Sequence, residues 1–235
     1  MLKAVVFQGL NTLNFEGIRT SVVRIPEVIR RVKEAQRICD SQEVIHLDLF
    51  NFLTSEDQVF LSNLCLKSLL SAIVQVGLFD RYLRYNQPPQ VLAGHSNGDS
   101  ALKVAAGVLT FEEMIFQSAA LQLSRSLAPL HLTDSPIILS GISLTEYGAY
   151  SVDPEKTPLA EVAVDKADPA KFVATLVEKL GVRCFVNIGP GNLLYFQLEE
   201  DLRMADIQVL ESIDLDPMLS WFWPSLSHRN LAMIQ

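Results

Sequence analysis

The segment VLAGHSNGDSALKVAAGVL, residues 91–109, decides the fold class of this chain. It begins with an apolar run typical of a buried strand and ends with a stretch typical of a helix. Between them, Gly94, Ser96 and Gly98 match the pattern G-x-S-x-G, in which a serine stands on a sharp turn between a strand and a helix. The glycines are needed because a Cβ there would clash with neighbouring backbone. The segment therefore predicts a strand, a tight turn and a helix, with Ser96 as a candidate nucleophile.

Strands and helices alternate along the rest of the chain. Strands are expected at 2–7, 90–94, 136–142, 183–188 and 207–213, and helices at Pro26–Asp40, Asp57–Phe79, Gly98–Gly107, Phe111–Leu127 and Ala170–Leu180. The segment Tyr147–Asp168 is expected to be a loop, because it combines prolines with scattered charges. This alternation predicts one α/β domain, residues 1–235, with a mostly parallel sheet flanked by helices.

Composition excludes several classes of protein. The 235 residues are 49% hydrophobic with a net charge of −8, which is typical of a globular protein and argues against a nucleic-acid partner. No apolar run is long enough for a membrane span, and the first residues are too short for a signal peptide. The three cysteines have neither disulfide nor zinc spacing and are expected to be buried thiols. A cytoplasmic protein without a metal is expected.

Four stretches resemble malonyl-CoA:acyl-carrier-protein transacylases and polyketide-synthase acyltransferase domains, in the same order along nearly the whole chain. They are VVFQGLN (5–11), FLSNLCLKSLLSAIVQ (60–75), GHSNGDSALKVAAGVLTFEEMI (94–115) and DPAKFVATLVEKLGVRCFVNIGPGNLL (168–194). The resemblance implies an α/β-hydrolase-like acyltransferase core. It also implies that Ser96 carries an acyl group between acyl-CoA and acyl carrier protein, without a permanently bound cofactor.

The resemblance implies further site residues. The backbone amides of Leu10 and Asn97 are expected to stabilise an oxyanion. His95 matches a histidine that the family carries before its nucleophile, and a site-shaping role is expected for it. The residues expected to bind substrate are Gln8, Gly9, Asn63, Gln117, Gly189, Gly191 and Asn192.

The chain departs from the family in three ways. The family's ferredoxin-like subdomain is expected to be absent, because the helix ending at Leu127 leads almost directly to strand 136–142. The histidine motif that supplies the family's general base is missing, and His131 falls at the start of that strand, past the place for the base. Gln117 or Ser118 stands where the family has a carboxylate-binding arginine, and Arg125 lies about two turns further along.

Three functions stay open. The chain is a compact acyltransferase with an unrecognised base, a non-catalytic binding or scaffold protein of a fatty-acid or polyketide system, or a small serine thioesterase. The last would use Ser96, an acid such as Asp201 or Asp206, and His228, in the order of α/β-hydrolases. His46 alternates with apolar residues, so a surface or core position is expected for it.

Two surfaces are candidates for partners. The helix at 26–40 carries Arg30, Arg31, Lys33 and Arg37, a local basic patch that could bind an acidic carrier protein, although a solvated helix face is the commoner explanation. The aromatic tail around Trp221, Phe222 and Trp223 is expected to cap the core or to form an oligomer contact.

Overall fold

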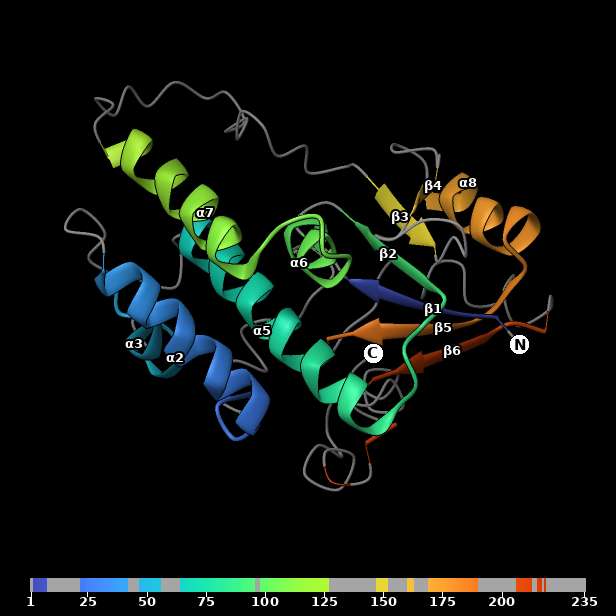
Figure 1. Ribbon diagram of the computed structural model, residues 1–235, viewed down its shortest axis with the longest axis horizontal. Coiled ribbons are helices and arrows are strands. Elements are labelled where there is room, and N and C mark those ends of the chain that lie inside the picture. Colours follow the sequence, from blue (N-terminus) through green and yellow to red (C-terminus); the bar gives the residue numbers. More distant parts are fainter. Residues whose placement is uncertain are drawn as a thin grey trace, which may run out of the picture.

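Six strands form one sheet within the residues that the structure, a computed structural model, describes (Figure 1). The strands are β1 (Leu2–Phe7), β2 (Val91–His95), β3 (Tyr147–Ser151), β4 (Ala160–Val162), β5 (Val182–Ile188) and β6 (Gln208–Glu211). Their order is β4-β3-β2-β1-β5-β6. β1 pairs in parallel with β2 and β5, and β5 with β6, whereas β3 pairs antiparallel with both β2 and β4. Four parallel strands confirm the predicted α/β class.

The structure describes a defined part of the chain: residues 2–7, 22–41, 47–55, 64–95, 98–126, 147–151, 160–162, 169–189, 206–212, 215–216 and 218. Its helices are α2 (Pro26–Asp40), α3 (Leu49–Thr54), α5 (Leu64–Tyr85), α6 (Gly98–Ala105), α7 (Phe111–Ser126) and α8 (Pro169–Ala174), which continues into a π-helical turn, η1 (Thr175–Lys179). Among these residues, none of the helices is long and apolar enough to cross a membrane.

Both faces of the sheet are covered by helices. On one face, Val5 and Phe7 of β1 belong to a core cluster with residues of α2, α3, α5, α6 and α7. On the other face, Ala4 and Val6 pack in a second cluster with Phe172 of α8. β1 is therefore buried on both sides, which explains why its sequence is a nearly continuous apolar run rather than an alternating one.

Several element boundaries differ from the sequence-based expectations. Strands β3 and β4 lie in Tyr147–Asp168, the segment expected to be a loop, so that expectation was wrong. The helix expected at Asp57–Phe79 extends further and ends at Tyr85, and α3 was not expected. The strand expected at 136–142 and the C-terminal aromatic tail lie outside the described residues, as does most of the segment in which the subdomain deletion is expected.

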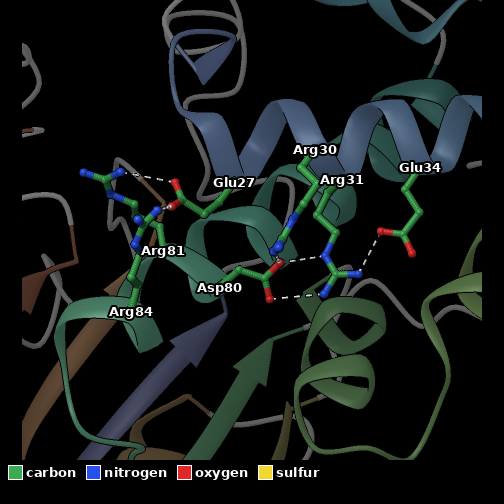
Figure 2. A network of polar contacts seen from close by, with 7 residues as sticks. All are labelled: Glu27, Arg30, Arg31, Glu34, Asp80, Arg81 and Arg84. Carbon is green, nitrogen blue, oxygen red and sulfur yellow. Dashed lines mark hydrogen bonds and ion pairs between the residues drawn. The ribbon is translucent and has the colours of Figure 1, made fainter.

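A network of ion pairs joins the C-terminal half of α5 to α2, as Figure 2 shows. Asp80 of α5 accepts hydrogen bonds from Arg30 (2.9 Å) and Arg31 (2.7 Å) of α2. Arg31 also stacks over the ring of Phe111, 4.9 Å from its centroid, and so links α7 to the same pair of helices. The last turns of α5 therefore depend on contacts with residues distant in sequence. This explains why the helix continues beyond the residues whose apolar pattern predicted it.

Arg81 lies at the centre of the second half of this network. Its guanidinium donates to Glu27 of α2 (3.2 Å) and, through Nε and Nη2, to both carboxyl oxygens of Asp216, which follows β6. Arg84 donates to the other oxygen of Glu27 (2.9 Å). The side chains of Arg81, Glu27 and Asp216 are each at most 10% exposed, whereas that of Arg84 is 63% exposed. One buried arginine thus joins α5 to α2 and to the segment after β6.

Candidate functional site

The junction between β2 and α6 is the centre of the candidate site. β2 ends at His95, α6 begins at Gly98, and Gly94 pairs with Phe7 at the carboxyl end of β1. The predicted strand and helix on either side of the serine are therefore confirmed. Ser96 and Asn97 lie outside the described residues, and so does the side chain of His95, so the nucleophile elbow itself stays a prediction.

Gly94 allows α6 to pack directly against the end of β2. A Cβ on Gly94 would lie 3.1 Å from Cδ2 of Leu102 and 3.3 Å from the carbonyl oxygen of Phe7. Both neighbours are fully buried, so neither can move away easily. The sequence argument that the pattern needs a glycine here is confirmed for this position. The helix that follows the serine is thus held against the strand that precedes it.

Gly94→Ala is expected to lower the free energy of unfolding by about 1–3 kcal/mol, the usual cost of overpacking a buried site. The measurement is urea unfolding of Gly94→Ala, Leu102→Ala and the double variant. Because Leu102 is one of the groups that the new methyl meets, the double variant should lose less stability than the two single losses combined. Strict additivity would show that the contact with Leu102 does not limit this position.

The carboxyl ends of the parallel strands meet beside this junction. Ile188 of β5 pairs with Phe7, which in turn pairs with Gly94. The next residue, Gly189, is buried and has φ of 116°, a backbone conformation that residues with a side chain rarely adopt. Gly189, one of the residues expected to bind substrate, therefore turns the chain at the same edge as the Gly94 junction. Ligands of open parallel sheets bind at this edge.

A buried polar pair at this edge was missed by the sequence analysis. Nδ2 of Asn187 donates to Oε1 of Glu211 (3.2 Å), and the main-chain oxygen of Asn187 accepts from the N–H of Ser212 (2.9 Å). Asn187 is fully buried, and Glu211 is nearly so. The signal in the sequence was a polar residue near the end of each of two apolar strands. The pair holds the ends of β5 and β6 together next to Gly189.

The remaining predicted residues are distributed as follows. Gln117 is exposed on α7. Asp206, a candidate acid for the thioesterase, is exposed with φ of 57° and precedes β6, so it lies at the amino edge of the parallel strands, opposite the junction. That position argues against its role in a triad with Ser96. The predicted residues outside the described part are Gln8, Gly9, Leu10, His46, Asn63, His131, Gly191, Asn192, Asp201 and His228; Arg125 lies in α7 with its side chain outside it.

Cysteine chemistry and metal binding find little support in the described residues. Cys39 and Cys184 are free and buried, as expected. Burial, with the nearby charge of Asp40, raises the pKa of the Cys39 thiol to about 11, and burial also raises the pKa of Cys184. Both thiols are therefore protonated at neutral pH and are poor nucleophiles. Over the same part of the chain, no cluster of His, Cys, Asp and Glu could hold a metal ion.

Comparison with known proteins identifies the fold. The sequence matches no family model and no curated protein. The structure is similar to the malonyl CoA-acyl carrier protein transacylase of Coxiella burnetii (17% identity, TM-score 0.60, 97% of this chain and 98% of that one). It is also similar to the acyl-carrier-protein S-malonyltransferase of Burkholderia pseudomallei 1710b (14%, 0.61, 93% and 98%). A third similar structure is a malonyl-transacylase in complex with its type II polyketide-synthase acyl-carrier protein (14%, 0.54, 90% and 95%). At these identities, the likeness shows a shared fold.

Proposed function

We propose that this chain is an acyltransferase-type protein of fatty-acid or polyketide synthesis, which takes an acyl group from acyl-CoA onto Ser96 and passes it to an acyl carrier protein. The observation that carries the proposal is the junction at the carboxyl edge of the sheet. There a parallel strand ends at His95, a helix begins at Gly98, and a serine stands in the two-residue connection. The transacylase fold of the similar structures supports the same conclusion.

The proposed reaction is an acyl exchange through an ester. Oγ of Ser96 attacks the carbonyl carbon of the thioester, and the negative charge that develops on the carbonyl oxygen is stabilised by the amides of Leu10 and Asn97. The C–S bond then breaks, CoA leaves as a thiol with the serine proton, and an acyl ester remains on Ser96. The thiol of the carrier attacks this ester in the same way and restores the serine. The scheme uses acyl-CoA as substrate and no other cofactor.

The proposed acyl group is neutral rather than malonyl. A malonyl carboxylate is best bound by a guanidinium that donates two parallel hydrogen bonds, which an amide cannot replace. The resemblance aligns Gln117 or Ser118 with the family's arginine, and Gln117 is exposed on α7. We therefore propose acetyl or a longer uncharged acyl chain as the group carried.

The test is the intact mass of the protein after incubation with acetyl-, butyryl- and malonyl-CoA. The expected result is an acyl adduct that is absent in Ser96→Ala and retained in Ser100→Ala, a matched serine on the first turn of α6. Malonyl-CoA should load no better than acetyl-CoA. A strong preference for malonyl-CoA would contradict the substrate proposal and would implicate Arg125, which Arg125→Gln would then test.

Two other functions remain as outcomes of the same experiment. The missing histidine motif favours a binding or scaffold protein, which would form no adduct with any acyl-CoA. A small thioesterase would release free acid continuously, and release would depend on His228 and on an acid such as Asp201. The exposed position of Asp206 at the opposite edge of the sheet makes the second alternative weaker.

A further inference from the structure

Charge is segregated along this chain. The two segments that carry α2 and α5, residues 22–41 and 64–85, contain eight Lys and Arg against four Asp and Glu, a balance of +4. The rest of the chain contains 11 Lys and Arg against 23 Asp and Glu, a balance of −12. The net charge of −8 is thus the sum of two basic helical segments and a strongly acidic remainder of the chain. Such asymmetry indicates a surface that attracts a partner of one sign.

The acidic groups of this helix pair are mostly neutralised within it. Glu27 is buried between Arg81 and Arg84, and the side chain of Asp80 is only 18% exposed and accepts from Arg30 and Arg31 (Figure 2). Glu34 pairs with Arg31 at 3.0 Å. Glu34 keeps its side chain 43% exposed, and the fourth acid, Asp40, is exposed and accepts from Gln36 (2.8 Å), so these two offset part of the positive charge that faces solvent.

Three cations remain on the outer face of α2. Arg30, Lys33 and Arg37 are exposed, and their spacing of three and four residues places them on one side of the helix. We call this set the α2 basic face. Arg30 keeps its side chain 63% exposed while bound to Asp80, and the described residues provide no ion pair for Lys33 or Arg37. The fourth cation of this helix, Arg31, does not belong to this face, because its side chain is only 22% exposed and pairs with Asp80 at 2.7 Å.

We infer that the α2 basic face docks an acidic protein, namely the acyl carrier protein of the proposed function, on which this inference rests. Charge complementarity identifies the partner: a row of exposed cations in an otherwise acidic molecule attracts a small acidic protein and orients its approach. The strongly acidic remainder of the chain repels extended polyanions such as nucleic acids and anionic membranes. In Figure 1 the arrowheads of β1 and β5, at the carboxyl edge, point toward the side of the molecule on which α5 and α2 lie.

The test compares two triple variants of equal charge change. Arg30→Gln/Lys33→Gln/Arg37→Gln removes the α2 basic face, and Lys171→Gln/Lys179→Gln/Arg183→Gln removes three exposed cations from the segment of α8, η1 and β5. Binding of a holo acyl carrier protein is measured by calorimetry at low and high salt. We expect the first variant to weaken binding about tenfold or more at low salt and the control to leave it nearly unchanged. Equal weakening in both variants overturns the inference.

A second measurement separates this inference from the proposed function. Acyl adduct formation from acyl-CoA does not involve the carrier, so the α2 variant should load Ser96 as fast as the unmodified protein. Carrier binding that depends on the α2 basic face but without any adduct would leave the docking inference standing and overturn the acyltransferase. If the adduct forms and the α2 variant binds the carrier as tightly as the unmodified protein, the acyltransferase proposal stands and the docking inference is overturned. Binding to phosphatidylserine vesicles through this face, with no carrier binding, would also overturn the inference.

Discussion

Arg81→Met is expected to lower the free energy of unfolding by about 3–5 kcal/mol, the usual cost of breaking a buried ion pair by removing one partner. The methionine keeps much of the side-chain volume but removes the guanidinium that the carboxylates of Glu27 and Asp216 share. Asp216 also ties the segment after β6 to α5, so the loss should include that contact. Urea unfolding of the purified protein measures it.

Arg84→Met is the matched control for this prediction. Arg84 donates to the same Glu27, but its side chain is 63% exposed, so its removal should cost much less than the removal of Arg81. Arg81→Met combined with Asp216→Asn should recover part of the loss, because Asp216 then no longer carries a buried charge beside the missing guanidinium. If Arg81→Met lowers the free energy of unfolding no more than Arg84→Met does, the ion pairs of Arg81 do not stabilise the fold.

The pH dependence gives this prediction a second readout. Burial disfavours the charged form of Glu27, but hydrogen bonds from Arg84 and Arg81 outweigh it and hold the pKa of Glu27 below its ordinary value of 4.5. A carboxyl group whose pKa is lowered in the folded state stabilises the fold at neutral pH. This stabilisation is lost as the pH falls from the ordinary pKa of 4.5 through the lowered pKa of the folded state. The difference in stability between the unmodified protein and Arg81→Met should therefore narrow as the pH falls below 4.5. A difference that stays constant with pH would indicate lost packing instead of lost charge pairing.

Acylation of Ser96 is expected to be slow at neutral pH and to rise about tenfold for each pH unit, as it does when hydroxide substitutes for a missing base. A positioned general base typically contributes ~10²–10⁴-fold, so loading should fall short of a complete site by that factor. The expectation rests on the sequence: His131 follows the place of the family's base, His46 precedes the serine, and His95 is its immediate neighbour. Single-turnover loading from acetyl-CoA between pH 6 and 9 measures the profile.

Histidine variants decide between the alternatives. His95→Ala, His131→Ala and His228→Ala should each leave the slow, rising profile unchanged. A fast rate with a plateau near neutral pH that disappears in His228→Ala would favour the thioesterase. The same collapse in His131→Ala would show that the deletion lies elsewhere than the sequence analysis assumed, and that His131 reaches the serine after all.

The elements that sequence analysis predicted well are those with local signals. The β2–α6 junction combines an apolar run, paired glycines and a helix whose end is marked by Gly107, whose N–H and that of Val108 cap the last carbonyls of α6. Strand β3, with the sequence YGAYS, was missed because it is short and its central Gly148 and Ala149 are unfavourable in strands, so pairing with β2 rather than its own pattern makes it a strand.

The same distinction applies to the candidate site. Gly94 and Gly189 could be identified because a close approach or an unusual φ requires glycine, and that requirement is visible in one residue. Asn187 and Glu211 could not be identified, because their hydrogen bond depends on the pairing of β5 with β6, which brings together residues 24 positions apart. The end of α5 was misjudged for the same reason, since Arg81 is held by residues of two other segments.

The position of β1 in the sheet has a consequence for how the chain folds during synthesis. β1 pairs with β2, as Ala4 does with Val91, and with β5, as Leu2 does with Val182. One edge of this apolar strand can pair early, but the other has no partner until about 180 residues later, when β5 leaves the ribosome. In that interval an unpaired hydrophobic strand edge is open to pairing with another chain. The protein should therefore be most prone to aggregation, and most dependent on chaperones, while it is still attached to the ribosome.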